Sequence, residues 1–371
     1  MTMTRSALTR LAVGATLGAA LVATAGAAGA APKAPTPAVA LQDFVSGPTS
    51  PEDIIEVPDS GVAIVSGLSD DPLSTSSVGH LYAIDAASRA VTEIWPDRAW
   101  GVEWDQARFP SCPGAPNPAI ASPHGINLEA RADGAYDLYV VNHGGREGVE
   151  IFRLDVRNGV DLTWTGCVTM PAGTFANGVA PLPGGDGFVV TNFFNPTKSD
   201  PFSQIFSDTP SGNLMRWDLA AGWSVVEDSA LAGPNGVVVT RDGRTAFVAE
   251  WGARMVHRIP LDRSRAAATS AIGRASVAVP FLPDNLRLSR QGEVLVTGQD
   301  YVAANVIACQ ANDLANCPTG LHVIAVDPKR MTSRTLYAGD PANFRAPTVA
   351  APVGDSIWVG AVKGARIAVL D

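Results

Sequence analysis

Six segments of the 371-residue chain each open on a residue that could bind a metal ion or move a proton. The opening residues, here called heads, are Glu52, His124, Asn177, Asn235, the pair Asp284 and Asn285, and Thr348. Most of these side chains offer carboxylate or amide oxygens, and hard cations such as calcium take about six to eight oxygen ligands. A histidine has an unperturbed pKa of about 6.5 and suits proton transfer at neutral pH. The set would support metal-assisted chemistry if the fold brought its members together.

Two of the heads belong to Asn-Gly dipeptides, at Asn177–Gly178 and Asn235–Gly236. Asn-Gly is normally the turn of a β-hairpin, because both residues tolerate positive φ. Here each dipeptide is followed by apolar residues, and the turn comes later, at "PGGDG" and at "TRDGR". The asparagines therefore stand at the start of strands, where a turn does not explain them.

The surrounding chain consists of short runs rich in Val, Ile and aromatic residues, bounded by Gly, Pro and Asp. Each head opens a strand, a turn and a second strand, and the heads recur roughly every fifty to seventy residues. A further strand pair follows most of these segments, as in "HLYAIDAASRAVTEIWP". Four strands repeated six times predict an all-β, six-bladed β-propeller with four-stranded antiparallel blades. The alternative, a pair of β-sandwiches, would not produce six similar openings.

In a propeller the innermost strand of every blade runs along the central channel. Residues at the same end of these strands converge on the axis, so the heads are expected to form a ring. Two carboxylates and three amides facing one axis predict a calcium ion in the central channel. The alternative is that these polar groups only cap strand ends by bonding to nearby backbone.

The first 45 residues are expected to lie outside the propeller. Residues 1–30 carry Arg5 and Arg10, then an apolar run of small residues ending in "AGA", which is typical of a secretory signal peptide. An uncleaved membrane anchor is the competing interpretation. Residues 31–45 are interpreted as a Pro/Ala-rich linker and residues 46–371 as the propeller. A secreted or periplasmic protein is expected.

Composition and motifs narrow the function further. The formal charge is −9 and no basic cluster interrupts the acidic balance, so neither nucleic acid nor, after signal cleavage, a membrane is an expected partner. No glycine-rich phosphate loop opens a helix, which gives a nucleotide cofactor no support. The sequence contains no G-x-S-x-G motif, so a serine hydrolase has no support. A small-molecule substrate is expected, and the oligomeric state is left open.

Four cysteines follow the apolar leader, and an even count behind an export signal favours disulfides. Three pairings are possible. The short spacing in "CQANDLANC" favours Cys309 with Cys317, which leaves Cys112 with Cys167.

Several blades resemble those of the paraoxonase family, calcium-dependent lactonases and arylesterases built on a six-bladed propeller. "PHGINLEARADGAYDLYVVNH" is similar to the family's second blade, "PNGVVVTRDGRTAFVAEW" to its fourth and "PDNLRLSRQGEVLVTG" to its fifth. "PTVAAPVGDSIWVGAVKGARIAVLD" resembles its closing segment. The similarity runs from about Glu52 to the C-terminus. It also extends to the wider superfamily that contains gluconolactonases and strictosidine-synthase-like proteins.

The resemblance assigns roles to individual positions. It implies that the catalytic calcium is bound by Glu52, Asn177, Asn235, Asp284 and Asn285. His124 matches the family's general base or its helper, and His143 matches the histidine that relays a proton to it; a histidine that simply ends a strand is the alternative for His143. Asp53 and the backbone carbonyl of Ile126 match ligands of a second, structural calcium.

The sequence also departs from the family pattern. Gly178 stands where the family has an acid after the third-blade asparagine, which weakens the case for a second calcium. Phe193 and Phe194 replace a family Asp-His, which makes the cavity more apolar. The insertion at about 95–122 could be a lid over the channel or ordinary packing between blades.

These observations predict a calcium-dependent hydrolase that opens lactones or cleaves aryl esters with a histidine-assisted water. Two alternatives stay open at this point. One is a gluconolactonase-like sugar lactonase that uses the same metal. The other is a propeller without catalysis, which binds a ligand and holds calcium only as a structural plug.

Overall fold

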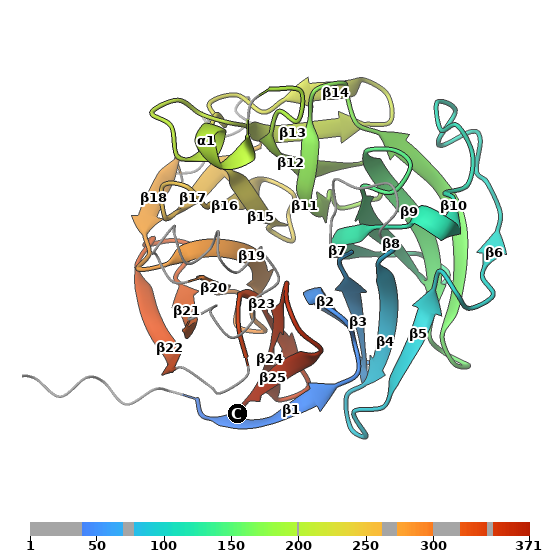
Figure 1. Cartoon of the computed structure of the whole chain (residues 1–371). Coiled ribbons are helices and arrows are strands. Elements are labelled where there is room, and N and C mark those ends of the chain that lie inside the picture. Colours follow the sequence, from blue (N-terminus) through green and yellow to red (C-terminus); the bar gives the residue numbers. More distant parts are fainter. Residues whose placement is uncertain (1–38, 70–77, 199, 262–272, 300–319, 340–343) are drawn as a thin grey trace, which may run out of the picture. The chain divides into compact units, whose positions relative to one another are not determined.

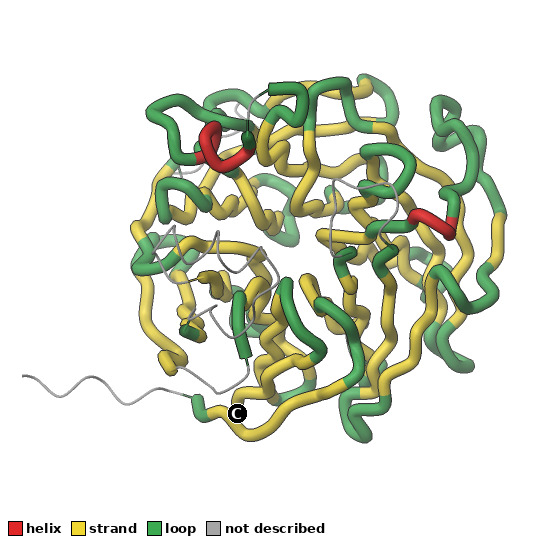
Figure 2. The backbone as a smooth tube through the Cα atoms, in the orientation of Figure 1, coloured by secondary structure: helices red, strands yellow, loops and turns green. Residues whose placement is uncertain are grey.

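The structure is a computed structural model and describes residues 39–69, 78–198, 200–261, 273–299, 320–339 and 344–371. Residues 37–371 form one compact unit, and the six sheets of its described part are arranged in a ring (Figure 1). The predicted six-bladed β-propeller is confirmed. Figure 2 shows how little helix accompanies the strands: the helices are η1 (Pro118–Ile120) and α1 (Pro201–Ile205) in the described ranges.

Blades 1 to 6 are numbered along the chain, and each has four antiparallel strands, to which blade 2 adds a short parallel fifth strand. The inner strands are β2 (Pro51–Val57), β7 (Pro123–Ala130), β11 (Phe175–Pro181), β15 (Pro234–Val239), β19 (Leu282–Leu288) and β23 (Pro347–Val353). The second strands are β3 (Val62–Gly67), β8 (Tyr136–Asn142), β12 (Gly187–Phe194), β16 (Thr245–Glu250), β20 (Val294–Gln299) and β24 (Ser356–Ala361). The third strands are β4 (His80–Asp85), β9 (Gly148–Asp155), β13 (Asn213–Asp218), β17 (Met255–Pro260), β21 (Leu321–Val326) and β25 (Arg366–Leu370). The outer strands are β5 (Val91–Trp95), β10 (Asp161–Thr169), β14 (Gly222–Val225), β18 (Ala275–Ala278), β22 (Ser333–Gly339) and β1 (Leu41–Ser46).

The core lies between neighbouring blades. Val189 and Leu214 of blade 3 pack against Val248 and Ile259 of blade 4, and the other pairs of blades pack in the same way. Each sheet is therefore covered on both faces, which explains why the strands consist of continuous apolar runs and do not alternate strictly with polar residues. The inner strands of adjacent blades also contact one another directly around the axis.

The ring is closed by the N-terminal strand. β1 pairs antiparallel with β25, so that the sixth blade takes its outer strand from the start of the chain. The predicted linker, 31–45, overlaps this strand, and the blades begin at Leu41. A closing strand, held by hydrogen bonds to β25, by packing of Phe44 against Phe344 and by an ion pair between Asp43 and Arg89, thus joins the two ends of the propeller.

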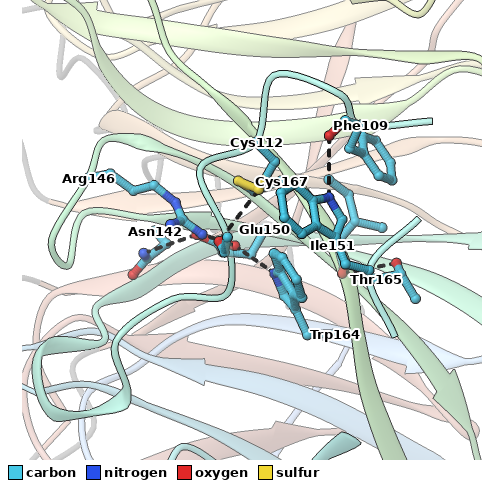
Figure 3. The surroundings of a disulfide bond; sticks show 11 residues. Phe109, Cys112, Asn142, Arg146, Glu150, Ile151, Trp164, Thr165 and Cys167 are labelled. Carbon is cyan, nitrogen blue, oxygen red and sulfur yellow. Dashed lines mark hydrogen bonds and ion pairs between the residues drawn. A yellow bond between two sulfur atoms is a disulfide. The ribbon is translucent and has the colours of Figure 1, made fainter. Parts of the chain in front are cut away.

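The insertion before blade 2 packs along the outside of that blade. Within it, β6 (Gly101–Val102) pairs parallel with β10, and the rings of Trp95 and Trp100 meet Phe152. Cys112 and Cys167 form the predicted disulfide, which ties the insertion to β10 (Figure 3). Cys309 and Cys317 lie outside the described residues.

The predicted signal peptide, residues 1–30, also lies outside the described residues. Among those that are described, no helix is long and apolar enough to cross a membrane.

Candidate functional site

Every inner strand loses its regular pairing at the head of its segment. The register between inner and second strand shifts in all six blades: between Pro51 and Asp53, Pro123 and Ile126, Ala176 and Val179, Pro234 and Val237, Pro283 and Leu286, and Pro347 and Ala350. All the predicted heads fall inside these breaks. A register break of this kind changes the direction of the side chains and interrupts the regular hydrogen bonding between the two strands.

The glycine after three of the heads allows neighbouring inner strands to approach. A Cβ atom on Gly125 would lie 2.2 Å from the Asn177 carbonyl oxygen, and one on Gly236 would lie 2.5 Å from the Asn285 Cα. Gly178 similarly sits against the backbone of Asn235. The second residue of each Asn-Gly pair is therefore glycine because a side chain has no room at the axis, and not because the chain turns there.

These contacts bring the predicted residues together. Asn285 Nδ2 donates to Glu52 Oε1 at 2.7 Å, and His124 Nε2 lies 3.5 Å from the same oxygen. Thr348 Oγ1 donates to the Glu52 backbone carbonyl and fixes the sixth inner strand beside the first. Together with the glycine contacts, they link the heads of all six blades.

The site contains buried oxygens that have no partner among the described residues. They are Glu52 Oε2, Asn177 Oδ1 and Asn235 Oδ1, and each of their side chains is less than 5% exposed. An unpaired buried oxygen is costly, so three of them at the heads of inner strands would favour the binding of a positive group. With Asp284 and Asn285 beside them, these oxygens match the chemistry of a calcium site, which takes carboxylates and asparagine carbonyls. The residues predicted to bind the first calcium fit that ion.

The electrostatics of the site point the same way. Burial raises the pKa of Asp284 well above its usual value, and the nearby Glu52 and Asp53 carboxylates raise it further. Burial lowers the pKa of His124, but the charges of Glu52, Asp284 and Asp53 outweigh that effect and leave the pKa raised. Burial and the neighbouring carboxylates thus both disfavour the ionised form of Asp284, and the same carboxylates favour a positive charge on His124.

The two predicted histidines are in direct contact and lead to a third residue. His124 Nδ1 lies 2.9 Å from His143 Nε2, and His143 Nδ1 lies 2.8 Å from Glu147 Oε2. Because a carboxylate only accepts hydrogen bonds, His143 carries its proton on Nδ1 and accepts from His124 through Nε2. Phe175 stacks on the His143 ring at 4.2 Å between centroids. Glu147, which lies in the polar "GGREGVE" turn, was not predicted from the sequence.

A buried network holds the loop that carries His143 and Glu147. Glu150 accepts hydrogen bonds from Arg146 and from Trp164 Nε1, and Asn142 Nδ2 donates to the Gly144 carbonyl (Figure 3). The disulfide lies beside this network in the same view. Asn142 and Arg146, on either side of His143, are therefore held by this network, which is anchored on β9 and β10.

A second supporting network holds Asp284. Gln299 Nε2 donates to Asp284 Oδ2 at 2.6 Å, and Trp251 Nε1 donates to Gln299 Oε1 at 2.8 Å. Trp251 also packs against Phe193. This chain of contacts joins the carboxylate to the aromatic residues of blades 3 and 4, and neither Gln299 nor Trp251 was predicted.

Asp53 and Ile126, predicted as ligands of a second calcium, are also brought together. However, the guanidinium of Arg287 lies between them: its Nη2 donates to Asp53 Oδ1 at 2.6 Å and to the Ile126 carbonyl at 2.9 Å. Burial raises the pKa of Asp53 to about 6, which leaves its carboxylate ionised at neutral pH beside this cation.

Comparison with known proteins gives the fold and no closer relationship. No protein-family model and no curated protein matches the sequence. The structure is similar to that of a luciferin-regenerating enzyme, with 13% sequence identity and a TM-score of 0.53 over 90% of this chain and 95% of the other. It is also similar to the PQQ-bound aldose sugar dehydrogenase of Streptomyces coelicolor, with 15% identity and a TM-score of 0.53 over 91% and 98% of the chains. At such identities the likeness concerns the fold alone.

The close approach of inner strands at the axis can be tested with Gly236→Ala. The new methyl group would meet the Asn285 backbone, and we expect the melting temperature to fall by roughly 5–10 °C. Gly273→Ala is the matched control, because a Cβ there meets nothing within 4 Å. Equal melting temperatures for the two variants would contradict this account of the glycine.

Proposed function

We propose that this chain is an extracytoplasmic, calcium-dependent hydrolase that opens lactones and cleaves aryl esters. The observation that supports the proposal most strongly is the set of unpartnered buried oxygens at the heads of the inner strands, in a ring whose blade 2 carries a histidine pair backed by a carboxylate. The disulfide and the predicted signal peptide support a location outside the cytoplasm. The blade resemblance to paraoxonases supports the reaction class.

The calcium ligands in this proposal are the predicted ones. Glu52, Asn177, Asn235, Asp284 and Asn285 would hold the ion, and Gln299 would orient the Asp284 carboxylate. Bound there, calcium would polarise an ester or lactone carbonyl and stabilise the negative charge that develops on its oxygen.

His124 would act as the general base through Nε2, the nitrogen that faces the ring of heads. Water loses a proton to this nitrogen as its oxygen bonds to the carbonyl carbon. The bond from that carbon to the ring or aryl oxygen then breaks, and the leaving oxygen takes a proton from His124. His143 accepts the hydrogen bond from His124 Nδ1 and helps to disperse the charge, while Glu147 fixes the orientation and tautomer of His143.

The surroundings of the histidine pair favour apolar substrates. Phe175 stacks on His143, and Phe194 stacks on Phe175 at 4.6 Å. Apolar side chains of this kind beside the histidine pair would suit an alkyl chain or an aromatic ring better than the hydroxyl groups of a sugar. We therefore expect aliphatic lactones and aryl esters to be better substrates than sugar lactones.

Hydrolysis of a panel of aliphatic lactones, sugar lactones and aryl esters tests the function. We expect the purified protein to turn over aliphatic lactones or aryl esters, to lose this activity in chelator and to regain it with calcium. Asn235→Ala should raise the calcium concentration needed for half-maximal activity, since it removes a ligand, whereas Asn158→Ala on an exposed turn should not.

Each other outcome of this panel decides between alternatives. Turnover that survives chelation would contradict a role for calcium in the chemistry. Preference for sugar lactones would favour a gluconolactonase-like enzyme. No turnover on any substrate, with melting still raised by calcium, would favour a binding propeller.

Glu147→Gln tests the positioning role of that carboxylate. Because glutamine can also donate, it would no longer hold His143 in one tautomer, and we expect kcat to fall by roughly 10- to 100-fold with little change in KM. Glu147→Asp should recover part of the loss, and the exposed Glu103→Gln should leave kcat unchanged.

Melting temperature separates this role from a structural one. Glu147→Gln should melt close to the wild-type temperature while kcat falls. An unchanged kcat, or a loss of kcat matched by general unfolding, would contradict the positioning role.

A further inference from the structure

The guanidinium of Arg287 lies among the oxygens expected to bind a second calcium. Besides its bonds to Asp53 and to the Ile126 carbonyl, Nε donates to the Ile54 carbonyl at 2.7 Å and Nη1 to the Leu286 carbonyl at 2.9 Å. One carboxylate and three carbonyl oxygens thus surround one positive charge. These are the ligand types that calcium takes in proteins.

Both oxygens of Asp53 are already used. Oδ1 accepts from the Ile54 N–H at 2.9 Å as well as from Arg287, and Oδ2 accepts from the Ile126 N–H at 2.9 Å. Asp53 is 1% exposed and Arg287 6% exposed, so neither has water as an alternative partner. Asp53 and Ile126 therefore do not fit a second calcium while Arg287 is in place, because the guanidinium occupies their oxygens and would repel the ion.

We propose that Arg287 is a built-in cation that takes the place of a second, structural calcium. Its contacts reach β2 of blade 1, β7 of blade 2 and β19 of blade 5. A divalent ion bound by such oxygens would join the same strands. The arginine joins these strands at any calcium concentration. A chelator should therefore leave the contacts between β2, β7 and β19 intact.

Arg287 also affects the proposed calcium site, because of its position in the chain. It lies two residues after Asn285, and its partner Asp53 directly follows Glu52. Asn285 and Glu52 are themselves hydrogen-bonded at 2.7 Å. The ion pair between Arg287 and Asp53 therefore holds two of the proposed calcium ligands in register before any ion binds.

Melting in excess chelator tests the ion pair without reference to activity. Arg287→Met and Asp53→Asn each leave a buried polar group or charge unpaired, and we expect each to lower the melting temperature by roughly 10 °C. The double variant should lose clearly less than the sum of the two, because the partners act together. Arg290→Met is the control: Arg290 pairs with Glu56 on the surface, and its loss should cost little.

Arg287→Lys adds a test of geometry. Lysine keeps the charge but has no planar fork to reach four oxygens, so it should melt below wild type. Strictly additive losses in the double variant, or a wild-type melting temperature for Arg287→Met, would overturn the proposal.

Calcium itself is the probe for the cation position. This part rests on the proposed function for the first calcium: titration calorimetry should give one equivalent per wild-type chain. In Arg287→Ala the oxygens are released, and calcium should raise the melting temperature by more than it does in wild type. This extra rise should disappear in Asp53→Asn/Arg287→Ala.

Two equivalents in the wild type, or equal calcium effects on wild type and Arg287→Ala, would overturn the proposal. Failure of the proposed function looks different. A protein without turnover would still show the coupled melting of Asp53 and Arg287 in chelator, and an active enzyme could lack it.

Discussion

Carboxylate and amide oxygens at the heads of the inner strands are buried, and a buried oxygen is stable only beside a hydrogen-bond donor or a cation. This constraint explains the arrangement of the residues at the centre of the propeller. The inner strands lose regular pairing at their heads, which frees the side chains there for other contacts. The glycines at 125, 178 and 236 let neighbouring inner strands approach closely, backbone against backbone, at the heads. Burial then removes the water that would otherwise solvate the oxygens there, and an unpaired buried oxygen is destabilising.

Two kinds of cation would meet this constraint along the same strands. At Glu52, Asn177 and Asn235, oxygens remain without a partner, and we propose that an exchangeable calcium binds there. Asp53 lies one residue after Glu52 on β2, and Arg287 lies two residues after Asn285 on β19. These two side chains form an ion pair with each other. A tethered cation suits a position that only has to hold blades together. An exchangeable divalent ion with open coordination suits a position that has to meet a substrate carbonyl.

The fold was predictable because its signal is repeated. Six similar openings, each followed by apolar runs and glycine turns, leave few architectures other than a propeller, and the heads then have to converge. The Cys112–Cys167 pair was predicted from spacing, because the short interval between Cys309 and Cys317 favoured their pairing and left the other two cysteines. The strand Leu41–Ser46 was missed because it follows a Pro/Ala run and its partner is at the far end of the chain. Arg287, Glu147 and Gln299 were missed for a related reason. In sequence they look like ordinary polar residues of a strand or turn, and their roles arise from contacts with other strands and blades or with His143 across a loop.

A crystal structure of the protein grown with calcium, with anomalous scattering measured for the ion, would test the central claim most directly. Our account predicts one calcium on the axis, about 2.4 Å from oxygens of Glu52, Asn177, Asn235, Asp284 and Asn285. It also predicts the Arg287 guanidinium, and no ion, between Asp53 and Ile126. An axis without calcium, or an ion bound to Asp53 with Arg287 displaced, would contradict it.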